Sequence, residues 1–191
     1  MCISRRQRGM TLIELIAFIV IVSVALVGVL TVLNVTAKSS GDPMIRKQML
    51  AVAEAVLEEV MLQPFTWCDP DDRSAATATS ATLDATATDP TQCWDAVEAI
   101  GPETVAGNLD LRLSATSPLD NVSDYNGTAI TTGITGTALP TGYSAAVSVA
   151  QSALNGIAAT ESLLITVTVS HAGDSLILQG YRTRYSPNSL P

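Results

Sequence analysis

The chain has 191 residues, of which 47% are hydrophobic and 15% charged, a size that suits one modest domain. Its 18 acidic and 10 basic residues give a formal net charge of −8, which disfavours binding to nucleic-acid phosphates because that requires clustered Lys and Arg. The sequence has one histidine and no Gly-rich phosphate loop, Cys/His ligand cluster or nucleophile elbow. We therefore expect no enzymatic activity, no cofactor, no metal and no nucleic-acid partner.

A basic leader and a long apolar run open the chain. Arg5, Arg6 and Arg8 precede Gly9, and residues 10–33 carry a single charge, that of Glu14. A helix over 10–33 would be about 36 Å long, enough to cross a hydrocarbon layer about 30 Å thick. The run therefore predicts a membrane span.

Glu14 is the unusual residue of this span. A carboxylate inside a span costs about 2.5 to 3.5 kcal/mol, so it marks a functional site that needs a cation. An ordinary secretory signal loses its apolar segment on cleavage, whereas cleavage after Gly9 would keep the helix and create an amine at Met10. We expect that amine, on a neighbouring subunit, to pair with Glu14; the alternative is an ordinary single-pass anchor.

The segment Arg-Gln-Arg-Gly-Met-Thr-Leu-Ile-Glu at residues 6–14 resembles the class III leader of type IV prepilins and pseudopilins, usually Gly-Phe-Thr-Leu-Ile-Glu. Met10 replaces the usual Phe. The resemblance implies cleavage between Gly9 and Met10 by prepilin peptidase, N-methylation of Met10, and packing of the helices in a filament core, where Glu14 acts in assembly. The leader arginines are expected to stay cytoplasmic, which places the rest of the chain in the bacterial periplasm.

A second helical segment is expected beyond the span. Residues 38–43 predict a kink or a restart of the helix, with Asp42 suited to the cap and Pro43 to the first position. Residues 44–61 then have an amphipathic pattern that needs a sheet to cover its apolar side. That side is formed by Leu50, Ala53, Leu57, Val60 and Met61, and the polar side by Glu54, Glu58 and Glu59.

Cys68 and Cys93 are an even pair once Cys2 is discarded with the leader. Disulfides persist in the periplasm, so we expect these two cysteines to be bridged, whereas with the single His171 they do not make a zinc site. The bridge would close a surface loop, since residues 74–91 are mostly Ala, Thr, Ser and Asp. Trp67 and Trp94 flank it and are expected to pack on the disulfide.

The second half of the chain is predicted to be an antiparallel sheet. Residues 143–150 alternate, 163–170 are a β-branched run, and 175–185 continue after a turn to make a hairpin. His171 then lies at an exposed turn, without a catalytic role. An earlier strand is expected around 109–113.

Two loops are rich in acidic and polar residues, 68–72 with Asp69, Asp71 and Asp72, and 119–127 with Asp120 and Asp124. Such oxygen-rich loops suit calcium, but neither has EF-hand spacing. Asn126-Gly127 is a turn signal in its own right. Turn formation is the favoured interpretation, and calcium binding is the alternative.

Together these patterns predict an α+β, pilin-like fold, with a cleaved leader at 1–9, a transmembrane and filament-core helix at 10–40, an amphipathic helix at 41–66 and a β-rich periplasmic head at 67–191. Later segments resemble the MshD-type minor prepilins of mannose-sensitive haemagglutinin (MSHA) pili, namely 64–65, 68–72, 101–103, 120–127, 142–143 and 180–183. The resemblance implies a minor pilin in pilus assembly or initiation, anchored in the inner membrane and then carried on the surface pilus. Its partners would be prepilin peptidase, major and other minor pilins, and the inner-membrane assembly machinery. The alternatives are a type II secretion pseudopilin and a membrane-tethered ligand-binding protein or adhesin.

Overall fold

The fold comes from a computed structural model that describes residues 11–105 and 108–184, without the side chains of residues 34–42, 105 and 108. The chain divides into two compact units, Met1–Ile45 and Arg46–Pro191. The first helix, α1 (Leu12–Leu62), contributes to both. Each unit is described by itself.

In the first unit, α1 is apolar on all sides over Leu12–Leu33, apart from Glu14. By length and composition, Leu12–Leu33 could cross a membrane, and its large side chains are exposed, Leu12 by 77% and Ile13 by 76%. The hydroxyl of Ser23 donates to Ile19 O at 2.7 Å and that of Thr31 to Val27 O at 2.8 Å. These polar groups are therefore satisfied within the helix, as an apolar environment requires.

The restart expected at residues 38–43 is not a helix boundary, because α1 runs through this segment with Pro43 inside it. Proline removes one backbone hydrogen bond from a helix, which can be tolerated where the following turns are anchored. Here they are, since Met49 and Ala53 are almost completely buried.

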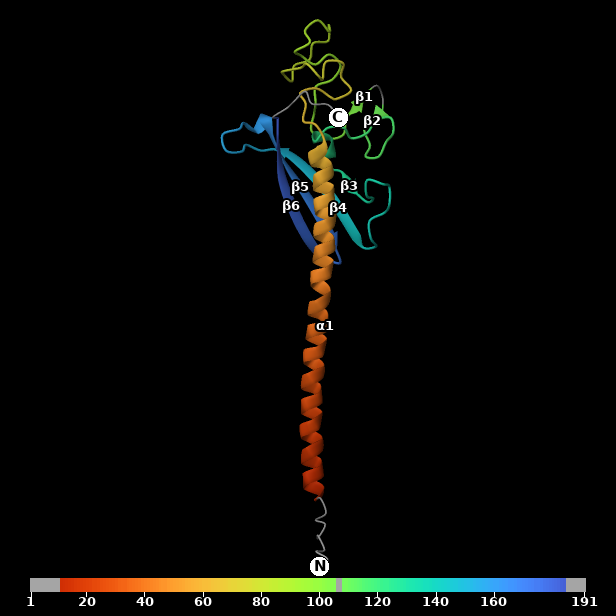
Figure 1. The fold of residues 1–191 in the computed structure, drawn as a ribbon, viewed down its shortest axis with the longest axis vertical. Helices are drawn as coiled ribbons and strands as arrows, with labels where there is room; N and C mark the ends of the chain where they lie inside the picture. Colours follow the sequence, from red (N-terminus) through yellow and green to blue (C-terminus); the bar gives the residue numbers. More distant parts are fainter. Residues whose placement is uncertain (1–10, 106–107, 185–191) are drawn as a thin grey trace, which may run out of the picture. The chain divides into compact units, whose positions relative to one another are not determined.

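The second unit contains a four-stranded antiparallel sheet in the order β3-β4-β5-β6 (Figure 1). Its strands are β3 (Ala129–Ile130), β4 (Tyr143–Gln151), β5 (Ser162–His171) and β6 (Asp174–Thr183). Val147 pairs with Val167, and Val167 with Leu178. The β4 strand and the β5–β6 hairpin were predicted, although residue 185 lies outside the described residues. The α+β, pilin-like layout is confirmed.

The strand predicted at 109–113 is wrong in most of its length. β2 (Asn108–Leu109) pairs with β1 (Thr104–Val105) in a separate two-stranded sheet. The chain then turns, with Ser114 N donating to Leu111 O at 2.9 Å and Leu113 at a φ of +67°, a value that a strand does not allow. Short β3 completes the main sheet instead.

The head half of α1 buries one face against the sheet (Figure 1). Met49, Ala53, Val56 and Val60 are 5% exposed or less, and Ala145, Val147 and Val149 are the buried residues of β4. The predicted face was rotated, since Leu50 is exposed and Leu57 and Met61 are half-buried. The helix is turned so that Leu57 meets Gly180 of β6, where an added Cβ would lie 3.3 Å from Leu57 Cδ1.

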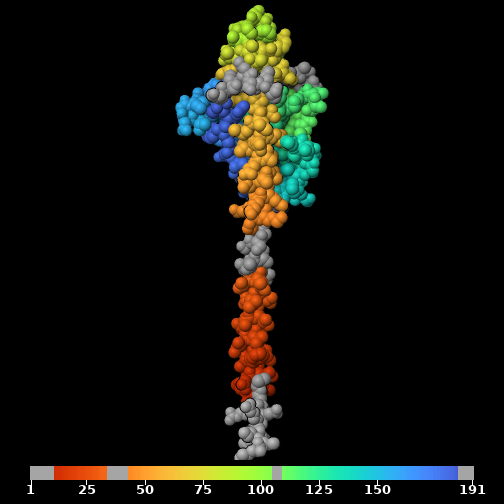
Figure 2. Space-filling model, in the orientation of Figure 1, coloured from red at the N-terminus to blue at the C-terminus, as the bar shows by residue number. Residues whose placement is uncertain are grey.

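A disulfide joins Cys68 to Cys93, with the two Cα atoms 5.4 Å apart, so the predicted pairing is the one in the structure. The enclosed loop forms a compact yellow-green knob at one end of the second unit (Figure 2). Residues 74–91 were expected to bury little, but Ala75 and Ala78 pack in a small core with the two cysteines, against Trp67 and Val97. The indole of Trp94 donates to Asp89 O at 2.8 Å.

Two short 3₁₀ helices complete the described elements, η1 (Ser123–Tyr125) and η2 (Ala159–Glu161). η1 is buried and carries Asp124. The turn predicted after it is present, with Asn126 N donating to Ser123 O and Thr128 N to Tyr125 O, both at 3.1 Å, and Gly127 at a φ of +79°.

Candidate functional site

The first candidate site is the beginning of α1. Gly9 and Met10, the predicted cleavage pair and methylation site, lie outside the described residues. Thr11 directly precedes the helix, and its carbonyl oxygen accepts from the backbone N–H groups of Glu14 at 3.1 Å and Leu15 at 3.2 Å. The Thr11 hydroxyl also accepts from Glu14 N at 3.4 Å. Thr11 is therefore a helix cap that the sequence analysis did not identify, although a Thr-x-x-Glu spacing signals one.

Glu14 lies in the first turn of α1. Its side chain is exposed, and so are those of its apolar neighbours Ile13 and Leu15. A carboxylate is favoured near a helix N-terminus, where backbone N–H groups point toward it. Glu14 is thus a negative charge on an apolar surface, at the end of the helix nearest the leader.

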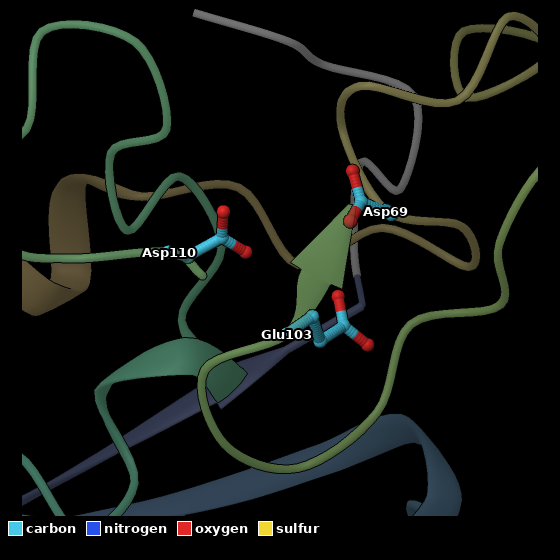
Figure 3. Close-up of side chains that lie close together, drawn as sticks. All are labelled: Asp69, Glu103 and Asp110. Atoms are coloured by element: carbon cyan, nitrogen blue, oxygen red, sulfur yellow. The ribbon is translucent and has the colours of Figure 1, made fainter. Parts of the chain in front are cut away.

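The second candidate site is a cluster of carboxylates in the head. Figure 3 shows Asp69, Glu103 and Asp110 facing a common space beside β1. One carboxylate oxygen from each of these three lies within 4.8 Å of the others, and the same holds for a second group that shares Glu103. The acidic cluster, as we call it, consists of Asp69, Glu98, Glu103, Asp110 and Asp124.

Backbone hydrogen bonds bring these separate segments together. Glu98 N donates to Trp67 O at 3.1 Å, and Asp69 N donates to Ala96 O at 3.3 Å, which aligns the segments beside the disulfide. Further along, Asp110 N donates to Glu103 O at 2.9 Å, and Gly101 N to Ser123 O at 3.0 Å. Residues 55 positions apart in sequence, Asp69 and Asp124, thereby contribute to one cluster.

Three members of the cluster are buried and two, Glu98 and Glu103, are half-buried. Their oxygens are incompletely paired. Asp69, Asp110 and Asp124 are 3%, 4% and 1% exposed. Asp124 Oδ2 accepts from the N–H groups of Asp120 at 3.0 Å and Asn121 at 2.8 Å, and Glu98 Oε1 accepts from the Ser123 hydroxyl at 2.7 Å. Among the described residues, Asp124 Oδ1 and Glu98 Oε2 have no hydrogen-bond partner.

Burial raises the pKa of each member of the cluster. It raises the pKa of Glu98 to about 10, helped by the negative charges of Asp124 and Glu103, and that of Glu103 to about 8. Desolvation likewise raises the pKa of Asp124 to about 7, and the pKa values of Asp69 and Asp110 shift in the same direction. Buried carboxylates of this kind must either take up protons or meet a cation.

One cation, that of Arg184, interacts with the cluster, and it also has other partners. The guanidinium of Arg184 is close enough to interact with Glu98, but it donates to Thr66 O, forms an ion pair with Glu161 at 3.4 Å, and stacks over Phe65 and Trp67 at 3.7 and 4.0 Å. Arg184 therefore compensates one edge of the cluster at most.

Asp72 shows the opposite behaviour, although it belongs to the same acidic loop as Asp69. Its Oδ1 accepts from Ser74 N and Ser74 Oγ, both at 2.7 Å, and its Oδ2 from Asp95 N at 2.6 Å and Ala96 N at 2.9 Å. Burial alone would raise its pKa, but these hydrogen bonds lower it to about 2. Asp72 is a structural anchor of the loop.

The structure thus joins the two acidic loops that the sequence singled out. Asp69 comes from the first and Asp124 from the second, whereas Asp71 and Asp72 lie outside both groups of close carboxylates. Burial and the charge of Asp124 raise the pKa of neighbouring Asp120 to about 7. No sequence signal predicted Glu98, Glu103 and Asp110 as site residues, because each is a single acid in a segment without a local pattern.

His171 ends β5 and is half-buried, more covered than the exposed turn histidine that was expected. Its ring stacks on Tyr143, with centroids 4.1 Å apart, and Nδ1 lies 3.1 Å from Gly142 O. The contacts hold the beginning of β4 against the end of β5.

Comparison with known proteins identifies one region. Residues 4–30 match the family described as prokaryotic N-terminal methylation motif, the motif of type IV prepilins. The N-terminal region of the chain is therefore prepilin-like, and the motif implies processing by prepilin peptidase and assembly with other pilins. No curated protein and no solved structure matches the chain significantly.

Proposed function

We propose that the chain is a minor pilin of an MSHA-like type IV pilus and contributes to pilus assembly or initiation after cleavage between Gly9 and Met10. The observation that carries this proposal is the continuity of the methylation motif at 4–30 with the exposed apolar helix Leu12–Leu33. The motif marks the chain for processing, and the helix has the length and composition for a membrane and then a filament core.

The helix explains how such a subunit changes environment. Its side chains are apolar on all sides and its hydroxyls are satisfied internally, so lipid and neighbouring pilin helices are equally suitable surroundings. Glu14 is the exception. In the filament it would pair with the Met10 amine of an adjacent subunit, because attraction between unlike charges strengthens as the surrounding dielectric falls.

The MSHA-like assignment rests on the resemblance in the head. Several of the segments that carry this resemblance contain residues with structural roles, which supports treating the segments as features of a shared fold. Gly180 leaves space for the side chain of Leu57. The carbonyl oxygen of Gly142 lies 3.1 Å from His171 Nδ1. Glu103 belongs to both groups of the acidic cluster.

Incorporation of Glu14→Val into pili tests the proposal. We expect the variant to be processed normally but reduced at least about tenfold in sheared pili, since removing one partner of a buried pair costs about 3 to 5 kcal/mol. Glu54→Val is the matched control, because Glu54 is an exposed carboxylate of the same helix outside the apolar stretch. Equal incorporation of Glu14→Val and wild type, normalised to processed protein, would favour a tethered ligand-binding domain or adhesin.

Processing is tested separately by Gly9→Val. Bulk before the scissile bond should block the peptidase, so intact-mass analysis should find the uncleaved chain. A mature product beginning at Met10, formed as efficiently as in wild type, would contradict the prepilin assignment. A type II secretion pseudopilin would give the same processing result but would co-purify with secretion components in place of surface pili.

A further inference from the structure

We propose that the acidic cluster of Asp69, Glu98, Glu103, Asp110 and Asp124 is a calcium site that ties the loops of the head together. The proposal concerns the second unit alone and does not depend on the pilin assignment. It starts from an imbalance of charge. Carboxylates from separate chain segments lie close together, and Arg184, the cation that interacts with Glu98, is itself held by other groups.

The independent sign of a ligand is Asp124. Asp124 is 1% exposed. Its Oδ2 accepts hydrogen bonds from two backbone N–H groups, whereas its Oδ1 has no hydrogen-bond partner among the described residues. Glu98 Oε2 is unpartnered in the same way. Asp124 and Glu98 form a close group with Glu103. A buried carboxylate oxygen without a donor is a large unfavourable term that a cation would remove.

The geometry suits calcium. Calcium binds oxygen at 2.3 to 2.6 Å, so ligands on opposite sides of one ion are roughly 4.6 to 5.2 Å apart. Within each group of three carboxylates, the ligand oxygens lie within 4.8 Å of one another. Glu103 is common to the two groups, which places its carboxylate between the Asp69–Asp110 side and the Glu98–Asp124 side.

The chemistry of the donors selects among metals. Every ligand offered is a carboxylate oxygen, whereas zinc and copper favour nitrogen and sulfur. Both cysteines of the head are in the disulfide, and His171 is engaged with Tyr143 and Gly142. Magnesium requires a smaller, near-octahedral site and keeps several waters. Buried carboxylates on irregular loops provide the larger and more adaptable set that calcium takes.

Other acidic residues of the head, such as Asp72 and Asp84, differ from the cluster because N–H and O–H donors surround their carboxylates. Asp72 has both oxygens filled by N–H and O–H donors. Asp84 likewise accepts from Thr86, Thr88 and Asp89. These carboxylates organise loops by hydrogen bonding. Those of the cluster lie against one another.

Calcium binding is tested on the full chain in detergent after treatment with EDTA. Titration with CaCl₂ in a calorimeter should give binding at or below about 10⁻³ M, as for extracellular calcium modules. Trp67 and Trp94 both lie in the head, so their fluorescence reports its unfolding. At about tenfold saturation, calcium should raise the Tm by roughly 3 to 6 °C. Magnesium should bind more weakly.

Two conservative variants assign the site. Asp110→Asn and Glu103→Gln should each weaken calcium binding at least about tenfold, since affinity depends on the number of charged ligands. Without calcium, both should unfold at the same temperature as wild type or higher, because they remove repulsion between like charges. Weaker calcium binding together with an unchanged or higher Tm without calcium would show that a ligand was lost and that the fold was not damaged. Asp174→Asn is the control, since Asp174 is exposed in the β5–β6 turn.

Two results would overturn the proposal. One is the absence of heat and of any Tm change with calcium up to about 10 mM, well above the range of extracellular modules. The other is calcium affinity in Asp110→Asn and Glu103→Gln equal to that of Asp174→Asn. Binding of magnesium as tight as calcium would overturn the choice of metal.

Discussion

Arg112 and Glu59 form a two-bond ion pair across 53 residues of sequence, with Nε to Oε1 at 2.6 Å and Nη2 to Oε2 at 2.7 Å. Their side chains are 9% and 12% exposed. The Tyr125 hydroxyl donates to Glu59 Oε1 at 3.0 Å, and Arg112 Nη1 donates to Thr132 O at 2.7 Å. One carboxylate of α1 therefore contacts two separate parts of the head, at Arg112 and Tyr125, and is linked to a third, at Thr132, through Arg112.

Glu59→Ala should destabilise the head by about 3 kcal/mol, because it leaves a nearly buried guanidinium uncompensated. Glu58→Ala, at an exposed neighbouring position, should change the free energy of unfolding by less than about 0.5 kcal/mol. Thermal unfolding followed by tryptophan fluorescence measures both. Equal Tm values for the two variants would mean that the ion pair contributes nothing.

Gly180→Val should also destabilise the head, by about 1 to 3 kcal/mol, although valine is otherwise favoured in strands. The reason is steric, since a Cβ at this position meets Leu57 Cδ1 at 3.3 Å and Met61 Sδ at 3.7 Å. In a Leu57→Ala background the same substitution should cost less, because the space is free. A double-mutant cycle checks this, and a coupling energy of zero would contradict direct contact.

Asp72→Asn should have a pH-dependent effect. The native pKa of Asp72 is about 2, below its ordinary value of 3.8. A lowered pKa contributes stability that is present above the unfolded value and lost as the pH falls through the native value. The variant should therefore lose about 1 to 2 kcal/mol near neutral pH, and the difference from wild type should shrink toward about pH 2. A difference independent of pH would contradict the role of the charge.

Removing the disulfide with Cys68→Ser and Cys93→Ser together should destabilise the head by about 3 to 4 kcal/mol on the chain-entropy estimate, given the separation of 25 residues. Exposure of the loop at 74–91 to protease should increase as well. Non-reducing peptide mapping of wild type provides the reference. If the Tm and the cleavage rate were the same with and without reductant, the bridge would have no structural effect.

The sequence predicted those elements whose signal is local. The alternation of β4 and the β-branched run of β5 encode a half-buried sheet, and the apolar run from Leu12 encodes the long helix. The register of α1 on the sheet was missed, because Leu50, Leu57 and Met61 suit an apolar face as well as Met49 and Val56 do. The register depends on contacts with residues far away in sequence, such as that between Leu57 and Gly180.

The candidate site was only half predictable for the same reason. Asp69 and Asp124 lie in loops that are visibly acidic, but Glu103 and Asp110 become neighbours through the antiparallel pairing of β1 with β2. The expected strand at 109–113 would have alternated Asp110 and Leu111 across a sheet. The pairing of β2 with β1 instead sets Asp110 beside Glu103, an outcome that spacing does not encode.

The disulfide has a consequence for the order in which the head forms. Asp69 and Glu98 are separated by 29 residues along the chain, but Asp69 directly follows Cys68 and Glu98 lies five positions after Cys93. Once the sulfurs are joined, the connecting path shortens to about six residues. The entropic free-energy cost of bringing the two carboxylates together then falls by about 1.4 kcal/mol, which is roughly a tenfold rise in their effective concentration. Formation of the disulfide in the unfolded chain therefore makes the approach of Asp69 and Glu98 easier. The loops of the head should fold more readily when Cys68 and Cys93 are oxidised than when they are reduced.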